Sequence, residues 1–419
     1  MNVTDSRSEL RTHWRALLGC ALAASMGTVG LHAYTSGAFV SALVDQAGYT
    51  REQMSLATFF LSATVAVTVP LAAMLMDRFG ALRIITLAVI GEALGFVLLG
   101  SMPQVFGAYA GGVVLLAVLG VGTTPPGFAR IVASRFDKSR GLALGLMISG
   151  LAITAITAPS WATWIVTEGG WRAGYWTLGA LVLTFGLIGV WLIRSDDRHA
   201  ARDTHAAIRP ARTGKGDWSA LRQPLYWMLL AGFLAPGFFS GGYLLHLISL
   251  LKDRGFTAAE AAQIQGLMGF TIFIGRIASG AALDRFRAQY VAAVAFTVSG
   301  LGCALLLTSN PLLVSLASLA IGLTIGAELD IMAYVIARYF GLESFGRLYG
   351  LAYGGLIIAS GASPLMISLI AGQGGYSRAL VVSSIGTILG AVILLCIRST
   401  RASSVQQFDS KHVQSAPAP

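Results

Sequence analysis

Long stretches of apolar residues, separated by short groups of charged residues, follow one another along the whole chain. Each is about 20 residues long or longer, the length that an α-helix needs to cross about 30 Å of hydrocarbon. A helix suits this setting because it satisfies its backbone hydrogen bonds internally. The pattern predicts an all-α membrane protein with twelve transmembrane helices, over residues 15–40, 52–76, 83–101, 105–130, 141–166, 172–193, 223–250, 259–283, 288–307, 311–337, 345–371 and 377–397.

The second half of the chain repeats features of the first half. The segment Asp77–Phe79, which reads Asp-Arg-Phe, recurs as Asp284–Phe286 after another apolar stretch, 207 positions later. The segment Gly141–Pro159 is echoed by Gly346–Pro364 at an offset of 205. A period this long in so apolar a chain indicates a duplicated membrane bundle, and therefore two pseudo-symmetric bundles of six helices each.

Two segments lack any apolar period and set the limits of the bundles. Residues 194–222 mix seven basic residues with Asp, Pro and Gly and predict a flexible cytoplasmic linker. Residues 399–419 are rich in Ser, Gln, Ala and Pro, a composition typical of a disordered tail. The N-terminal bundle is therefore expected at residues 1–193 and the C-terminal bundle at residues 223–398.

Composition and charge place this chain in a membrane. Hydrophobic residues make up 55% of the sequence and charged residues 11%, against about 25% charged in an ordinary soluble domain. The net charge of +10 does not indicate nucleic-acid binding, because 23 of the 29 basic residues fall on the side that holds both predicted termini. This asymmetry is the positive-inside rule and predicts cytoplasmic termini. The preference for arginine over lysine further suggests a bacterial inner membrane.

Several classes of function find no support in the sequence. Cys20, Cys303 and Cys396 lie far apart, without metal-ligand spacing, so no metal site or disulfide framework is expected. There is no Ser-His-Asp arrangement and no phosphate-cradling loop, which argues against an enzyme and against a cofactor. A membrane sensor would need a folded cytoplasmic output domain, and neither the linker nor the tail can form one.

The loop after the second predicted helix, Asp77–Arg83, resembles the signature loop of the major facilitator superfamily. It departs from that pattern at Ala73, and its second copy departs at Arg287, where the family has glycine. An Asp beside Arg residues at a helix end can form charge-assisted hydrogen bonds to the facing helix and hold one end of a transporter closed. The residues assigned to this gating role are Asp77, Arg78, Arg83, Asp284 and Arg285. Alternatively, they are interfacial anchors.

Three further segments resemble the oxalate/formate antiporter and monocarboxylate transporter branch of that superfamily: Arg140–Gly145, Gly170–Arg172 and Gly346–Gly350. The resemblance implies that Arg276, in the span 259–283, binds a substrate carboxylate. The chain lacks the lysine that oxalate exchangers carry in the span matching 345–371, and one membrane cation suits one carboxylate better than two. It also lacks the acid that precedes the arginine in animal monocarboxylate carriers, since Ile272 stands there.

Ionisable residues inside the predicted spans are the main candidates for chemistry. A central charge costs about 2.5–3.5 kcal/mol on insertion scales, so such residues persist mainly where they act. Arg276 either binds substrate or pairs with an acid of the span 311–337. Glu328 and Asp330, two residues apart, cannot face the same cavity. We expect one to couple protons, with Glu328 favoured over Asp330. Glu92 has no assigned role.

Histidines and tyrosines at similar depth are the next candidates for substrate binding. The resemblance to the superfamily implies that the spans 15–40 and 223–250 line the cavity. These spans hold His32, Tyr34, Tyr243 and His246, and Tyr353 lies in the span 345–371. The histidines are alternatively packing residues.

The sequence thus predicts a proton-coupled secondary transporter of a small organic anion, favouring a monocarboxylate symporter. The alternatives are an oxalate/formate type of exchanger and a proton-driven exporter of drugs or sugars. The expected partners are substrate, protons and lipid, for a monomer without a metal or cofactor.

Overall fold

The computed structural model describes residues 9–136, 140–203, 219–283, 285–372 and 375–397, which are almost entirely helical. The first half contains α2 (Trp14–Ser25), α3 (Thr28–Ala47), α4 (Arg51–Phe79), α5 (Ala81–Ser101), α6 (Phe106–Gly120), the 3-10 helix η1 (Val121–Thr123), α7 (Pro125–Arg135) and α8 (Arg140–Asp203). The second half contains η2 (Ser219–Arg222), α9 (Pro224–Phe239), α10 (Tyr243–Lys252), α11 (Ala258–Leu283), α12 (Ala288–Leu305), α13 (Pro311–Ala371) and α14 (Ser377–Cys396).

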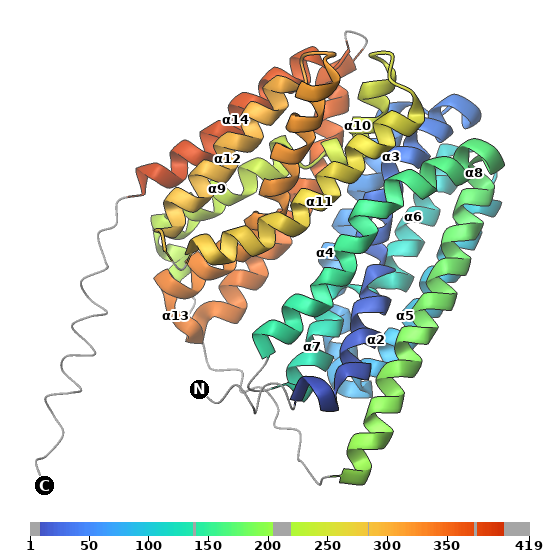
Figure 1. Ribbon diagram of the computed structural model, residues 1–419, viewed down its shortest axis with the longest axis vertical. Helices are drawn as coiled ribbons and strands as arrows, with labels where there is room; N and C mark the ends of the chain where they lie inside the picture. The colour runs from blue at the N-terminus through green and yellow to red at the C-terminus, as the bar shows by residue number, and fades with distance from the viewer. Residues whose placement is uncertain (1–8, 137–139, 204–218, 284, 373–374, 398–419) are drawn as a thin grey trace, which may run out of the picture.

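The membrane-spanning pattern predicted from the sequence is found in these helices. Within the described residues, eleven segments are long and apolar enough to cross a bilayer. One of them, Ala143–Asp196, is 54 residues long and contains two predicted spans. It is divided at Gly170, whose φ of 77° lies in the left-handed region that glycine tolerates. Figure 1 shows α8 turning back on itself, so this segment crosses twice. The all-α membrane fold is confirmed.

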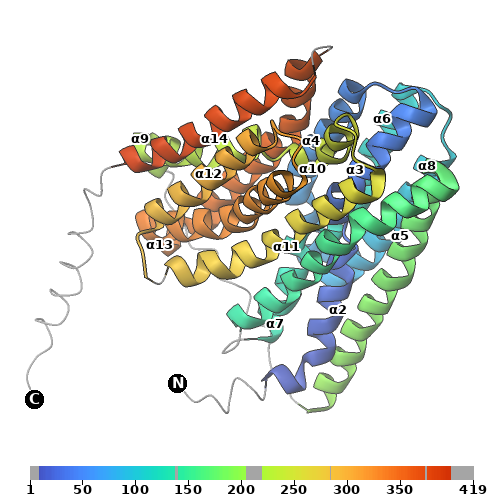
Figure 2. The ribbon, with the colours of Figure 1, turned by 45° about the horizontal axis from the view of Figure 1, so that its top comes forward.

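The helices form two groups that lie side by side. The blue-to-green elements α2–α8 make one group and the yellow-to-red elements α9–α14 the other, in both Figure 1 and Figure 2. Each group has its own core: Phe39 stacks on Tyr175 at 4.1 Å in the first, and Phe233 packs edge-on against Phe296 in the second. The groups meet through α3 with α10, α4 with α13 and α8 with α11.

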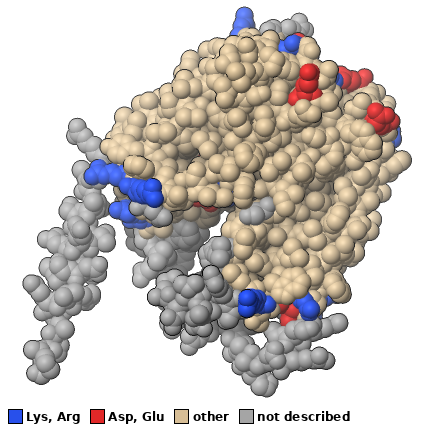
Figure 3. Space-filling view, in the orientation of Figure 1, with Lys and Arg blue, Asp and Glu red and all other residues tan. Residues whose placement is uncertain are grey.

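The surface of the molecule fits a protein that spans a bilayer. On the face shown in Figure 3, charged residues gather at the margins, and the broad surface between them is almost bare of charge. The same view shows the surface hollowed between the two groups of helices. We call the end that carries Gly48 and Gly255 the Gly48 end, and the opposite end, which carries Gly80, the Gly80 end.

The predicted linker and tail lie mostly outside the described residues. Helix α8 continues to Asp203, and η2 covers Ser219–Arg222. Residues 204–218 and 398–419 lie outside the described part of the chain. The bundle limits at residues 193 and 223 therefore stay a prediction.

Three membrane spans are interrupted, two of them where glycine allows close approach. The first span breaks between α2 and α3, where a methyl group on Gly27 would collide with the carbonyl oxygen of Thr123. The seventh breaks between α9 and α10, where Gly242 packs against the backbone of Pro364 and donates its N–H to Ser363 Oγ over 2.8 Å. The fourth breaks at η1, before Pro125. Each break frees backbone groups inside the membrane, where they must find partners within the protein.

The backbones of α11 and α8 also lie in direct contact where the two groups of helices meet. On α11, a methyl group on Gly269 would collide with the carbonyl group of Ala155 on α8, and one on Gly266 would lie 2.9 Å from the carbonyl oxygen of Ile156. This contact lies on the half of α11 nearer the Gly48 end. It requires glycine because any side chain would separate the two helices.

We expect Gly269→Ala to open the Gly48 end. Overpacking costs about 1–3 kcal/mol, and an energy of that size shifts a two-state equilibrium about 5- to 150-fold. Spin labels on the exposed residues Gln46 and Ala259, in a background with cysteines replaced by serine, should show longer distances. Gly280→Ala on the same helix is the control, since a methyl group there meets open space. Identical distance distributions for the two variants would contradict the role of the Gly269 contact in closing the Gly48 end.

Candidate functional site

An ion pair joins two helices of the second group at membrane depth. Arg276 on α11 places Nη1 3.5 Å from Oδ1 of Asp330 on α13. The two side chains remain 24% and 40% exposed. Charged groups exposed inside a membrane span face an aqueous cavity rather than lipid, because hydrocarbon penalises them strongly. Because Arg276 also interacts with Tyr34 of the first group, the pair lies toward the boundary between the two groups of helices.

Tyrosines from both groups surround this ion pair. The charge of Arg276 interacts electrostatically with the hydroxyl groups of Tyr34 on α3 and of Tyr349 and Tyr353 on α13. The rings of Tyr349 and Tyr353, one helical turn apart, have centroids separated by 6.3 Å. The site therefore combines one cation, one carboxylate and phenol groups drawn from both halves of the chain.

Glu328 does not share this site. Its side chain is buried, faces Gly237 of α9, and leaves Oε1 without a hydrogen bond. The acid that pairs with Arg276 is Asp330, which the sequence analysis had ranked behind Glu328 for proton coupling. Glu328 and Asp330 do lie in different surroundings, as their spacing on one helix requires. Which of them carries the proton stays a prediction.

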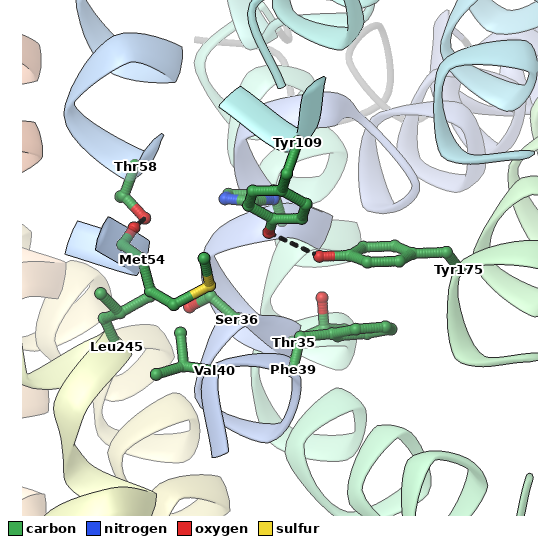
Figure 4. A pocket seen from close by; sticks show the side chains of 10 residues that line it. Thr35, Ser36, Phe39, Val40, Met54, Thr58, Tyr109, Tyr175 and Leu245 are labelled. Carbon is green, nitrogen blue, oxygen red and sulfur yellow. Dashed lines mark hydrogen bonds between the residues drawn. The ribbon is translucent and has the colours of Figure 1, made fainter. Parts of the chain in front are cut away.

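His32 lies apart from Tyr34, although both are on α3. Figure 4 shows the small cavity that His32 lines, with Tyr109 and Tyr175 joined by a hydrogen bond of 2.8 Å. The Nε2 atom of His32 is buried and makes no hydrogen bond. Residues two apart on a helix point about 200° apart, so His32 and Tyr34 face different spaces. A direct contact of His32 with substrate is not supported by this placement.

Tyr243 and His246 likewise have other partners. The Tyr243 hydroxyl donates to Ser383 Oγ over 3.1 Å, and the ring is fully buried. The His246 ring nitrogens lie 3.1 Å from the Tyr376 hydroxyl and from Ser55 Oγ, and 3.0 Å from the Pro364 carbonyl oxygen. The sequence argument placed both residues with the substrate. In the structure, the contacts of His246 tie α10 to α4 and α13 near the Gly48 end.

The Gly48 end is held closed by a set of charged residues that we call the latch: Asp45, Arg51, Lys252 and Asp253. Arg51 of α4 forms a two-pronged ion pair with Asp253, at 2.5 and 2.7 Å. Lys252 Nζ lies 2.7 Å from Asp45 Oδ2 on α3. Each pair joins the first group of helices to the second, so the latch closes the end opposite to Gly80.

One aromatic residue connects the latch to the buried His246. The Arg51 guanidinium lies over the ring of Tyr376, 5.4 Å from its centroid, in a cation–π contact. Burial raises the pKa of Tyr376 to about 12, although the nearby Arg51 charge acts in the opposite direction. The Tyr376 hydroxyl is therefore protonated at neutral pH and can donate a hydrogen bond to His246 Nδ1.

The residues assigned to gating are only partly described. Arg78 and Arg83 are exposed beside Gly80, and Arg78 lies over the Phe79 ring at 5.2 Å. Arg285 is exposed. The side chain of Asp77 and the whole of Asp284 lie outside the described residues, so the gating role stays a prediction.

Sequence reasoning missed Tyr349 and the latch. Tyr349 lies inside the segment Gly346–Gly350 that suggested the transporter branch, and its spacing of four from Tyr353 could have placed both on one face. The latch residues were visible only as charges in two separate loops. Their pairing, across 202 positions for Arg51 and Asp253, depends on how the two groups of helices meet.

Two facing groups of membrane helices, with a charged and aromatic site between them and one end closed, define a membrane transport protein. The family model described as Major Facilitator Superfamily matches residues 17–327. The chain belongs to this superfamily.

Two relatives illustrate its range. A gallate transporter of Pseudomonas putida is 25% identical over 65% of this chain and 70% of its own. Monocarboxylate transporter 13 of Rattus norvegicus is 26% identical over 62% of this chain and 60% of its own. Among solved structures, a bacterial homologue of the human lysosomal transporter Spinster, in an inward-facing and occupied conformation, has a TM-score of 0.71. It is 18% identical and covers 90% of this chain and 95% of its own, which supports the fold.

We expect Asp253→Asn to loosen the latch slightly. Exposed ion pairs contribute about 0.2–1 kcal/mol, and the Arg51 and Asp253 side chains are 35% and 43% exposed. The ratio of closed to open molecules at the Gly48 end, measured with spin labels on Gln46 and Ala259, should therefore fall by about five-fold at most. Glu52→Gln, a neighbouring exposed acid, is the control. A loss as large in Glu52→Gln would show that net charge, and not the pair, holds this end.

Proposed function

We propose that this protein is a secondary active transporter of a small organic anion, a monocarboxylate, coupled to protons and working by alternating access. It lies in the inner membrane of a bacterium with both termini in the cytoplasm, as the distribution of basic residues suggests. The observation that carries the proposal is the ion pair of Arg276 with Asp330, which stays partly exposed at membrane depth.

Arg276 is the group that binds the substrate carboxylate. A guanidinium is planar and always charged, and it presents paired donors that match the two oxygens of a carboxylate. Tyr34, Tyr349 and Tyr353 supply hydroxyl donors and ring faces around it. A gallate transporter and a monocarboxylate transporter among the relatives support a carboxylate as the substrate.

Asp330 provides a route for proton coupling. In the absence of substrate, its carboxylate forms an ion pair with the Arg276 guanidinium. A proton added to Asp330 releases the guanidinium, which then pairs with the carboxylate of the substrate. One proton enters with one monoanion, so the occupied site keeps the same net charge as the empty site. Glu328 is the alternative proton carrier because its buried carboxyl lies on the same helix.

Alternating access follows from the arrangement of the two ends. The latch and the contact at Gly269 close the Gly48 end. The cavity that holds Arg276 would then open at the Gly80 end, which is cytoplasmic in this proposal. When the halves rock, the Asp77–Arg83 loop would meet the facing group and close that end instead.

We expect Arg276→Lys to weaken substrate binding. Lysine keeps the charge but loses the paired donors, and a hydrogen bond to a charged group is worth about 1.5–3 kcal/mol. The expected loss in affinity is about 10- to 150-fold, measured as uptake of labelled lactate and gallate into proteoliposomes. Arg287→Lys, at an exposed position before α12, should behave as the unchanged protein does. Equal affinities for both variants would exclude Arg276 as the carboxylate-binding group.

We expect Asp330→Asn to uncouple uptake from the proton gradient. Asparagine mimics the protonated acid, so substrate exchange should continue, while an inward proton gradient should no longer drive accumulation. Glu328→Gln is measured in parallel in the same proteoliposomes. Coupling retained in Asp330→Asn and lost in Glu328→Gln would assign the proton to Glu328. Wild-type exchange that ignores the gradient would favour an anion exchanger of the oxalate/formate type.

A further inference from the structure

A carboxyl group in the first group of helices is buried at the centre of a membrane span. Glu92 lies near the middle of α5 (Ala81–Ser101) and is 0% exposed. A charge at this depth is unfavourable unless it is neutralised or paired. The position is far along the sequence from Arg276, in the other half of the chain, and has no part in the anion site described above.

The contacts of Glu92 come from two interrupted spans. The Thr123 hydroxyl, at the end of η1, lies 2.7 Å from Glu92 Oε2 and 2.7 Å from the Gly120 carbonyl oxygen. Thr28, the first residue of α3, donates its N–H to Thr123 Oγ1 over 3.1 Å, and its own hydroxyl lies 3.3 Å from the same atom. The second carboxyl oxygen, Glu92 Oε1, is buried and makes no hydrogen bond.

The backbone is fitted closely around these oxygens. A methyl group on Gly120 would collide with the Thr28 hydroxyl and lie 3.3 Å from Glu92 Cβ. A methyl group on Gly27 would collide with the Thr123 carbonyl oxygen. The breaks in the first and fourth spans thus bring the hydroxyl groups of Thr28 and Thr123 to one carboxyl group. Oxygens at interrupted helices are the ligands that membrane transporters use for small cations.

No cationic side chain neutralises Glu92 in the described part of the chain, where the ion pairs involve other acids. The ionisable groups of the neighbouring helices have partners elsewhere: Tyr109 of α6 bonds Tyr175 of α8, and Arg135 of α7 pairs with Asp196. On α3, His32 lies one turn beyond Thr28 and lines the cavity of Figure 4. Neutralisation must therefore come from a bound ion.

We propose that Glu92, Thr123 and Thr28 form a binding site for a small monovalent cation, either H⁺ or Na⁺. The cation neutralises the carboxyl group and occupies the side of Oε1. Because Thr28 directly follows the break in the first span and Thr123 ends η1 at the break in the fourth, a bound cation favours one arrangement of these breaks. The site is a property of the first group of helices and does not depend on the nature of the anion.

Thermal unfolding of the purified full chain in detergent tests this site. In choline chloride, the unfolding midpoint of the unchanged protein should fall by a few degrees as pH rises from 5.5 to 8.5. The folded state holds a proton that the unfolded state has lost in this range, so stability decreases as pH rises. Glu92→Gln, which is neutral at every pH, should lose this part of the pH dependence. Glu52→Gln, an exposed acid, is the matched control and should keep it.

A sodium titration at pH 8.5 separates the two cations. For a sodium site, added NaCl raises the midpoint of the unchanged protein with the logarithm of its concentration, relative to choline chloride, and has no such effect on Glu92→Gln. For a proton site, NaCl and choline chloride give the same midpoint. Glu92→Gln that follows the unchanged protein at every pH and sodium concentration would overturn the proposal.

Thr123→Val provides a second variant should Glu92→Gln fail to fold. It keeps the carboxyl group but removes a donor that stabilises the charged form, so the pH dependence should shift to higher pH. An unchanged profile would also overturn the proposal. The measurement needs no substrate, so its failure and a failure of the Arg276 site can be told apart.

Discussion

The cost of placing a charge in hydrocarbon governs the structure of this protein. Backbone polar groups are satisfied inside helices, and the few charged side chains at membrane depth need water, a partner or a bound ion. Arg276 and Asp330 have each other, and both side chains stay partly exposed. Glu92 has the hydroxyl groups of Thr123 and Thr28, which come from two interrupted spans. The placement of the helices, the breaks within them and the space between the two halves all serve this requirement.

The fold could be predicted from the sequence because its signal is repeated many times. Apolar length gives each span, and the recurrence of Asp-Arg-Phe gives the two halves. The breaks within the membrane spans were harder to predict from the sequence. The break at Gly27 depends on a contact with Thr123, nearly a hundred positions away, and a single glycine in an apolar run does not reveal such a contact.

Only some residues of the candidate site could be predicted from the sequence. Arg276 could be found because a charged residue in an apolar span is conspicuous, and Tyr34 and Tyr353 lie close to it in the structure. The choice between Glu328 and Asp330 could not be made from spacing, which shows that they differ in direction but not which of them faces α11. His32 and His246 illustrate the same limit, since both are at a suitable depth and both face other partners. Depth is encoded locally, whereas direction depends on how helices pack.

The latch has a consequence for the environment in which the protein works. The four side chains of its two ion pairs are 33–57% exposed. At physiological ionic strength, interactions between exposed charges are screened over about 8 Å. Dissolved salt therefore weakens the latch, whereas the backbone contact at Gly269 is uncharged and insensitive to it. Closure at this end thus has one component that responds to the surrounding electrolyte and one that does not. In the proposed alternating-access cycle, with the latch on the outer side of the membrane, a move from dilute to saline water would shift the resting balance between the two conformations without any change in substrate.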